Sequence, residues 1–479
     1  MDTSEIKTHP DYDYYKSYWE DCYVLIDQGD SKTIKSKNYQ QTYLPKLDSH
    51  SRAGYPQGKE EYEDFLFRAV WSDIPSDTVE EVLGKMFSGN SSFKNLPEVF
   101  KFYLETITSD GKGLINLEET VSKKQLQYTR VGLMAYIPKA QDAKTMPKVA
   151  VYNSLNIINW HQFENSKGQT RYDMVLLKTV VNEMDPETFE YRDVTYYIIH
   201  GLIPEGFQNQ GKYYKVTIKD SDFEKYGKKY SDRVNHYSYI EPKFKGFNLD
   251  YVPFVVVNGN NIDEEINIPC LYEQSILSVS AYNASALYKL KCKLQTWAML
   301  VGSGFNLDNK PDKGQKANGM MLSDDPQAKA EYIQPRADAV EALLKDWENA
   351  KQQARDKGIV IANKTEAESG VALEIRGDNQ ANAYKMLVKW RNAGIVRILS
   401  YIADWGSIKI KDPNEMIVPF TDFNISTVST EDMLRLAELV ERGRLPEPDF
   451  YQFCKKHNFT SYENFDEFQS NLLTDNFAE

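Results

Sequence analysis

Apolar residues recur every three or four positions in several stretches of this chain, which is the spacing of one face of an α-helix. One such face joins Ile276, Ala284, Leu287 and Leu294, and no proline or glycine interrupts residues 271–301. The spacing therefore predicts a long helix over 271–301. The same pattern predicts further helices over 62–70, 79–87, 336–357, 373–405 and 430–443.

The middle of the chain has a different pattern, made of short runs rich in Val, Ile, Tyr and Thr. Turn sequences such as Asn165-Ser166-Lys167-Gly168 separate these runs. Together they predict an antiparallel β domain built from hairpins. The predicted strands are 131–137, 149–152, 173–181, 194–200, 213–218 and 254–257, with a separate one at 416–420.

Three segments follow neither pattern. Residues 1–50 are rich in Tyr, Asp and Lys and are expected to form an extended arm. Residues 302–335 are expected to be loops, within which Asn318-Gly319 has the sequence of a hairpin turn. Residues 358–372 combine a short apolar run with a polar tip and are also expected to be a loop.

The 479 residues are too many for one compact core, so the length predicts two or more modules. The chain has 57 Lys and Arg against 70 Asp and Glu, a net charge of -13 at pH 7. This excess of acids argues against tight phosphate binding over the whole surface, although DNA can still slide past. The mean hydropathy of -0.58 and the lack of a long apolar run predict a soluble chain with no membrane partner.

Sequence signatures of metal and nucleotide chemistry are absent. The four cysteines form no C-x-x-C pair, no two histidines stand four residues apart, and no G-x-x-x-x-G-K-[ST] or G-x-S-x-G motif occurs. Residues 108–119 resemble an EF-hand loop, but Lys112 places an ammonium group among the expected ligands. We therefore expect no metal site, no cofactor and no enzymatic activity, and a tight turn followed by a helix at 108–126.

The stretch from Gln274 to Leu307 contains no Asp or Glu but holds Lys289, Lys291 and Lys293. Two interpretations stay open for these lysines. They either face an acidic surface on a neighbouring copy of the chain or contact DNA phosphates.

Short motifs follow one another along most of the chain, from about residue 43 to 439. They are Tyr43-Leu44-Pro45, Phe65-Leu66-Phe67-Arg68-Ala69, Leu83-Gly84-Lys85-Met86-Phe87, Arg130-Val131-Gly132-Leu133, Ile157-Ile158-Asn159-Trp160, Val252-Pro253-Phe254 and Tyr282-Asn283-Ala284-Ser285-Ala286. In number and order they resemble the podovirus-type branch of the portal proteins, the head-to-tail connectors of tailed bacteriophages. The order of predicted elements is similar to that family as well.

The resemblance implies an α+β portal fold with named parts. These are an N-terminal arm and β-rich wing (1–270), a first stem helix (271–301), a clip (302–335), a second stem helix (336–357), a tunnel loop (358–372), a wing helix and strand (373–428) and a helical crown (429–479). It also implies a homo-dodecamer at one capsid vertex of the virion, made in the host cytoplasm, through which double-stranded DNA is packaged and ejected without sequence specificity. The implied protein partners are the terminase large subunit, head-completion, adaptor and tail proteins, and the major capsid and scaffolding proteins.

Candidate site residues follow from this resemblance. Lys364 in the tunnel loop and Lys357 beside it are the expected DNA-channel contacts, against the alternative that each is a solvated lysine outside the bore. Lys310, Lys313 and Lys316 in the clip are the expected docking residues for terminase and adaptor proteins.

Two rival functions remain at this stage. Neighbouring acids, including Glu60-Glu61, Glu80-Glu81, Asp263-Glu264-Glu265 and Asp324-Asp325, would suit a virion-associated glycan hydrolase, but we expect them on solvated surfaces. A tail-adaptor ring protein is the second rival. It would share the ring and lack the pair of stem helices.

Overall fold

The computed structural model combines helices with antiparallel sheets, which confirms the predicted α+β class. It describes residues 7–47, 58–138, 145–165, 167–226, 231, 238–295, 299–303, 327, 329–333, 338–358, 370–421, 430–456, 460 and 464–469. Within these ranges, no helix is both long enough and apolar enough to cross a bilayer.

Residue contacts divide the chain into two compact units. Unit 1 comprises Met1–Asp27, Ser76–Tyr272 and Gly358–Glu479, and unit 2 comprises Gln28–Pro75 and Glu273–Lys357. Each unit therefore combines segments that are far apart in the sequence.

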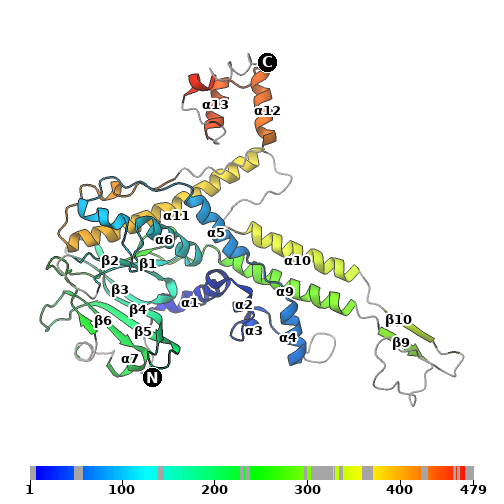
Figure 1. Ribbon diagram of the computed structural model, residues 1–479, viewed down its shortest axis with the longest axis horizontal. Coiled ribbons are helices and arrows are strands. Elements are labelled where there is room, and N and C mark those ends of the chain that lie inside the picture. The colour runs from blue at the N-terminus through cyan, green and yellow to red at the C-terminus, as the bar shows by residue number, and fades with distance from the viewer. Residues whose placement is uncertain are drawn as a thin grey trace. The chain divides into compact units, whose positions relative to one another are not determined.

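Unit 1 contains two antiparallel sheets (Figure 1). In the larger sheet, of order β3-β4-β5-β6-β7, each strand pairs with the next along the chain, as successive hairpins do. The smaller sheet has the order β2-β1-β8. The strands are β1 (Val131–Tyr136), β2 (Lys148–Asn153), β3 (Ile157–Glu164), β4 (Thr170–Met184), β5 (Tyr191–Leu202), β6 (Tyr213–Lys219), β7 (Ser238–Ile240) and β8 (Phe254–Val257).

The six strands predicted between residues 131 and 257 are confirmed, with ends that shift by a few residues. The sequence pattern did not predict β3 or β7. Register shifts interrupt the pairing of β3 with β4 between Ile157 and Asn159 and between His161 and Gln162, so β3 lacks a clean alternation of apolar and polar residues. β7 has only three residues, too few to produce a recognisable pattern.

Helices make up much of both units. Those lying wholly or mostly in unit 1 are α1 (Pro10–Cys22), the π-helix η1 (Tyr23–Gln28), α5 (Ile74–Met86), η2 (Glu98–Leu104), α6 (Leu114–Tyr128), η3 (Ser154–Asn156), α7 (Asp220–Tyr226), α11 (Gly370–Trp405), η4 (Pro413–Glu415), α12 (Thr430–Glu441) and α13 (Glu447–Lys456). Unit 2 has α2 (Ser31–Ile34), α3 (Gln40–Tyr43), α4 (Lys59–Arg68), α9 (Tyr272–Gln295) and α10 (Asp338–Asp356), with strands β9 (Met299–Ser303) and β10 (Lys329–Ile333).

The core of unit 1 lies where α11 packs on the smaller sheet. Ile395, Leu399 and Ile402 repeat at helical spacing and are fully buried in this core. Gly394 allows close approach, because a Cβ atom there would lie 2.2 Å from Cγ2 of Val257 on β8. The helix is therefore held against the sheet by backbone proximity as well as by apolar packing.

The extended arm predicted for residues 1–50 is wrong for the described residues 7–47. The ring of His9 caps α1 by accepting a hydrogen bond from the amide of Asp11 at 3.2 Å, and Trp19 is fully buried. Tyr12 and Tyr15 lie two turns and one turn before Trp19, with ring centroids 5.8 and 5.9 Å from its ring. The packing face of α1 is thus largely tyrosine. The sequence therefore lacks the aliphatic residues at helical spacing that would have predicted this helix.

Three other predicted elements need correction. The helix predicted over 271–301 ends at Gln295, because residues 299–303 pair with β10 as a strand. The strand predicted at 416–420 reduces to one β-bridge between Ser92 and Val418. The loop predicted at 358–372 ends earlier than expected, because α11 already begins at Gly370. Residues 359–369 lie outside the described residues.

The helix predicted to run from Thr430 to Gly443 is confirmed as α12.

Candidate functional site

The middle of α9 carries small side chains, which allow other segments of unit 2 to approach its backbone. Ser285 and Ala286 are fully buried. The hydroxyl of Ser285 accepts a hydrogen bond from the amide of Val70 at 2.9 Å, and the side-chain amide of Asn283 donates to the carbonyl of Tyr43 at 2.9 Å. Ser285 and Ala286 therefore serve packing inside unit 2.

Helices α9 and α10 form an antiparallel pair (Figure 1). At one end, Nζ of Lys357, just after α10, lies 2.7 Å from Oε2 of Glu273 at the start of α9. Further along the pair, the rings of Tyr288 and Trp347 have centroids 5.6 Å apart, and Nζ of Lys289 lies 5.9 Å from the centroid of Trp347. Aromatic and cation–π contacts thus join the two helices.

A β-hairpin connects the two helices at the other end of the pair. Strands β9 and β10 pair in antiparallel register from Met299 opposite Ile333 to Ser303 opposite Lys329. The segment 302–335, expected to be loops, therefore has a two-stranded base. Lys310, Lys313 and Lys316, together with the Asn318-Gly319 turn, lie outside the described residues.

Of the two predicted DNA-channel residues, the structure describes Lys357 and not Lys364. The side chain of Lys357 is 59% exposed in its ion pair with Glu273. The hydrogen bond from Lys357 lowers the pKa of Glu273. Lys357 therefore keeps most of its surface in water while it joins the ends of α9 and α10.

Lys289 and Lys293 of the acid-free stretch have partners inside unit 2. Nζ of Lys293 lies 2.8 Å from Oδ2 of Asp64, which also accepts from Nε of Arg68 at 3.0 Å. These hydrogen bonds, from Arg68 first and Lys293 second, lower the pKa of Asp64. Lys289 contacts the Trp347 ring. At least two of the three lysines are therefore engaged within a single copy of the chain.

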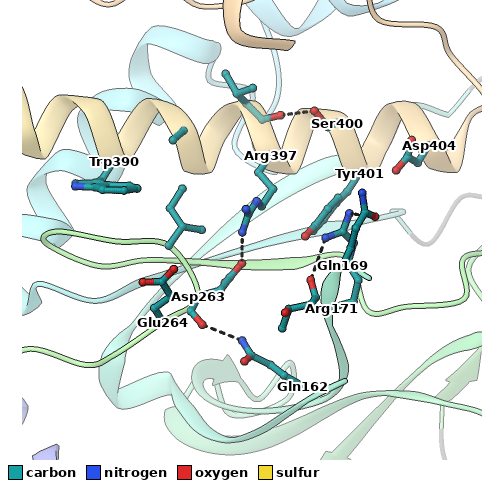
Figure 2. A pocket seen from close by; sticks show the side chains of 14 residues that line it. Gln162, Gln169, Arg171, Asp263, Glu264, Trp390, Arg397, Ser400, Tyr401 and Asp404 are labelled. Atoms are coloured by element: carbon teal, nitrogen blue, oxygen red, sulfur yellow. Dashed lines mark hydrogen bonds and ion pairs between the residues drawn. The ribbon is translucent and has the colours of Figure 1, made fainter. Parts of the chain in front are cut away.

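Unit 1 contains a pocket of about 850 Å³ between α11, the start of β4 and the loop that follows β8 (Figure 2). Its lining is strongly polar and includes two arginines, three acids and two large aromatic rings. These residues are Arg171, Arg397, Asp263, Glu264, Asp404, Trp390 and Tyr401.

Asp263 is the most connected residue of the pocket. Its Oδ1 accepts hydrogen bonds from the amide of Val256 at 2.6 Å and the hydroxyl of Tyr172 at 3.1 Å, and its Oδ2 lies 2.9 Å from Nη1 of Arg397. Burial raises the pKa of Asp263, and the hydrogen bonds from Val256 and Arg397 oppose this rise. Asp263 also has a left-handed backbone, with φ of 59°. The expectation that Asp263 and Glu264 form a solvated acidic pair is therefore wrong for Asp263.

Arg171 is the pocket cation without a carboxylate partner among the described residues. Its guanidinium carbon lies 4.9 Å from the ring centroid of Tyr401 and 5.4 Å from that of Tyr251, and its Nε is buried without a hydrogen-bond partner. The hydroxyl of Tyr251 donates to Asp404 at 3.1 Å. Nη1 of Arg171 donates to the carbonyl of Thr170 at 3.0 Å and its Nη2 to Oε1 of Gln169 at 2.8 Å. Stacking between two tyrosines and these two neutral acceptors thus hold Arg171 at the wall of the pocket.

The predicted turn and helix at residues 108–126 are confirmed. Nζ of Lys112 lies 2.9 Å from Oδ2 of Asp110, Gly111 has φ of 78°, and α6 begins three residues later at Leu114. Lys112 thus forms an ion pair with Asp110 at this turn. Across the described part of the chain, no three His, Cys, Asp or Glu side chains converge as metal ligands would.

The sequence carried only a partial signal for the pocket. Arg397, Tyr401 and Asp404 follow one another at four and three residues, which places them on one face of the predicted helix. Tyr401 is itself part of the apolar face that predicts the helix over 373–405, so the three residues do not stand out as a separate polar face. Nothing in the sequence near Arg171 indicates that it lines a pocket. Its position depends on stacking against Tyr251 and Tyr401, which are distant in the sequence.

No protein-family model matches this chain, and no curated protein matches it. Function is therefore inferred from the residues and geometry described above, together with the resemblance of the motifs.

Proposed function

We propose that this chain is the portal subunit of a tailed bacteriophage. Copies assemble into a dodecameric ring at one capsid vertex, and double-stranded DNA passes through the ring during packaging and ejection. The chain itself catalyses no reaction in this proposal, since the terminase large subunit supplies the ATP chemistry. The protein belongs to the virion and is found in the host cytoplasm before assembly.

The observation that carries the proposal is the antiparallel helix pair of unit 2, joined by the β9–β10 hairpin. In a portal subunit, α9 and α10 correspond to the stem and the hairpin to the base of the clip. The β-rich part of unit 1 and the long helix α11 correspond to the wing, and α12 and α13 correspond to the crown. A tail-adaptor ring would not need this helix pair.

The net charge of the chain suits a protein that lets DNA slide through it better than one that binds DNA tightly. A net charge of -13 per copy repels phosphates at long range and avoids the tight, salt-sensitive binding that would stall a moving duplex. Lysines repeated around the ring would supply weak contacts to phosphate without reading sequence. Lys357, largely exposed, and Lys364 are the residues proposed for this role.

The clip is proposed as the docking surface for terminase and, later, for head-completion, adaptor and tail proteins. Lys310, Lys313 and Lys316 lie in the long connection between β9 and β10. Replacing all three by alanine should abolish terminase docking in a pull-down and leave the oligomer intact. Unchanged docking would remove this assignment.

Particle size tests the proposal most directly. The purified chain, measured by native mass spectrometry and imaged in negative stain, should give wide rings with a central hole. Replacing Trp347 by alanine should weaken the helix pair and reduce ring yield. The chain would not be a portal subunit if it remained monomeric at every protein concentration and ionic strength tried.

A glycan hydrolase remains a second candidate because the unit 1 pocket holds three carboxylates beside Trp390 and Tyr401. The connections of Asp263 argue against it. Both of its oxygens already accept hydrogen bonds from protein groups, so it is placed as an acceptor and not as the proton donor that such an enzyme requires. Release of fragments from purified peptidoglycan that is lost in Asp263→Asn would favour the hydrolase.

A further inference from the structure

Residues 31–47 form a basic segment of unit 2 in a chain that is acidic as a whole. The segment contains no Asp or Glu, and its charged residues are Lys32, Lys35, Lys37 and Lys46. Asp30, directly before it, is used as the N-cap of α2, where its Oδ1 accepts from the amides of Lys32 at 2.7 Å and Thr33 at 2.9 Å. The segment is therefore locally positive.

Packing inside unit 2 fixes the backbone of this segment. Leu44 is buried, and its carbonyl accepts a hydrogen bond from the hydroxyl of Tyr62 on α4 at 2.8 Å. Nζ of Lys35 donates to the carbonyls of Phe67 at 3.2 Å and Ala69 at 2.6 Å, at the end of α4. Lys35 therefore serves the fold, and the segment presents its other lysines from a fixed backbone.

The other three lysines of the segment are open to solvent. Lys32, Lys37 and Lys46 are exposed and form no ion pair among the described residues. The nearest helix, α4, carries four acids, of which Glu61, Glu63 and Asp64 already bind groups of unit 2. Three lysines of this surface are therefore left without a carboxylate partner.

The second acid-free stretch of the chain lies next to the first. The side-chain amide of Asn283 on α9 donates to the carbonyl of Tyr43 at 2.9 Å, across 240 positions in the sequence. The described part of the second stretch, residues 274–295, forms most of α9. The fold thus places two acid-free segments side by side, so α9 adds no acid beside the lysines.

The composition of the surface distinguishes DNA from a protein partner. No large apolar side chain is exposed within residues 31–47, all of which the structure describes, and the exposed uncharged side chains include Asn38, Gln41 and Thr42. Protein interfaces bury apolar side chains at their centre, whereas Lys, Ser, Thr, Asn and Gln contact phosphates. On α9, by contrast, Ile276 and Leu287 are 39% and 40% exposed. Residues 31–47 therefore fit the phosphate backbone of a nucleic acid.

We propose that residues 31–47 contact the phosphate backbone of double-stranded DNA through Lys32, Lys37 and Lys46. This inference rests on the proposed conduit and adds a second contact surface to the one expected at Lys357. Glu273, the partner of Lys357, and Asn283, beside the segment, lie about 15 Å apart along α9. A duplex presents about one phosphate charge per 1.7 Å, so a duplex lying along α9 would pass both surfaces.

The salt dependence of DNA binding by assembled rings tests this contact. In the triple variant Lys32→Ala/Lys37→Ala/Lys46→Ala, the slope of log affinity against log salt concentration should become shallower by about 1 or more, because fewer counterions are displaced. The matched control is Lys212→Ala/Lys243→Ala/Lys245→Ala, which removes the same charge from exposed lysines of unit 1 that form no ion pair with any described residue. Equal slopes for the two variants would overturn the proposal.

A photo-cross-linking amino acid at position 38 tests the contact directly. In rings loaded with a labelled linear duplex, position 38 should cross-link to DNA, whereas position 208, which is exposed in unit 1, should not. Cross-links from position 38 to protein in place of DNA would overturn the proposal in favour of a protein partner. Rings that bind DNA without a cross-link at position 38 would remove this surface alone, whereas failure of the unmodified chain to form any ring would count against the portal proposal itself.

Thermal unfolding separates these lysines from Lys35. Lys35→Ala leaves two carbonyls at the end of α4 without their donor, so its thermal midpoint should fall. The triple variant should unfold at the same temperature as wild type. A triple variant that unfolds as early as Lys35→Ala would show that its lysines serve the fold, and the proposal would be wrong.

Discussion

Arg391 on α11 and Glu118 on α6 form an ion pair enclosed within unit 1, with Nη2 3.4 Å from Oε2 and side-chain exposures of 2% and 0%. Ser91 donates to the same Oε2 at 2.7 Å, and Nη1 of Arg391 donates to Ser122 at 3.1 Å. Burial raises the pKa of Glu118, and Arg391 opposes that rise. The pair therefore joins two core helices at a large cost in desolvation.

Removing one partner of this pair should be far more harmful than removing both. Glu118→Leu alone leaves a buried guanidinium group without its carboxylate, and we expect a loss of about 3–5 kcal/mol in the free energy of unfolding. The double variant Glu118→Leu/Arg391→Met should recover most of that loss. Urea denaturation measures both values, and a double variant as unstable as the sum of the single ones would contradict this explanation.

Gly394 should be intolerant of even one added methyl group. The new Cβ atom of Gly394→Ala would clash with Val257 across the contact between α11 and β8. We expect a loss of about 1–3 kcal/mol, measured by thermal or urea unfolding.

Gly84→Ala is the control for this substitution. Gly84 lies inside α5, and a Cβ atom there would meet nothing within 4 Å. Alanine should therefore stabilise the helix by about 0.5–1 kcal/mol. If both alanine variants moved stability in the same direction, close packing would not be the reason for glycine at position 394.

Asp110 should titrate at unusually low pH. The hydrogen bond from the Thr108 hydroxyl, followed by that from Lys112, lowers the pKa of Asp110 to about 2. Since the folded pKa lies below the unfolded value, the stabilising contribution is present above about pH 4 and is lost as the pH falls toward 2. Carboxyl chemical shifts in an NMR titration report this pKa directly, and Thr108→Ala should raise it toward 3.8. A wild-type pKa near 3.8 would disprove the contacts at this turn.

Lys357 should matter for DNA and hardly at all for folding. Its ion pair with Glu273 is largely exposed, so Lys357→Ala should change stability by at most about 1 kcal/mol. In assembled rings, the same change should reduce the salt dependence of DNA binding, because a ring with fewer lysines at the DNA neutralises fewer phosphates and so displaces fewer counterions. Glu273→Gln is the control, since it keeps the lysine and removes its partner. A salt dependence that is identical in wild type and Lys357→Ala would place Lys357 outside the bore.

The parts of the fold that follow regular periods could be predicted from the sequence. Ile398 and Tyr401, on the apolar face that predicts α11, are buried in the core, whereas Trp390 of the same face is only partly buried. The β8 strand was predicted with its observed ends. Residues 7–47 could not be predicted in the same way, because tyrosines form the packing face of α1. Asp263 looked like a surface acid because nothing in its neighbourhood indicates that Arg397, over a hundred residues away, is its partner.

The make-up of unit 2 has a consequence for how the chain folds. Its segments Gln28–Pro75 and Glu273–Lys357 are joined by contacts such as the hydrogen bond between the Val70 amide and Ser285, which are 215 residues apart in the sequence. The entropy lost in closing so long a loop opposes these contacts until many of them form together. Helices α2, α3 and α4 therefore cannot complete their packing until α9 has been synthesised, so this unit is completed late during translation.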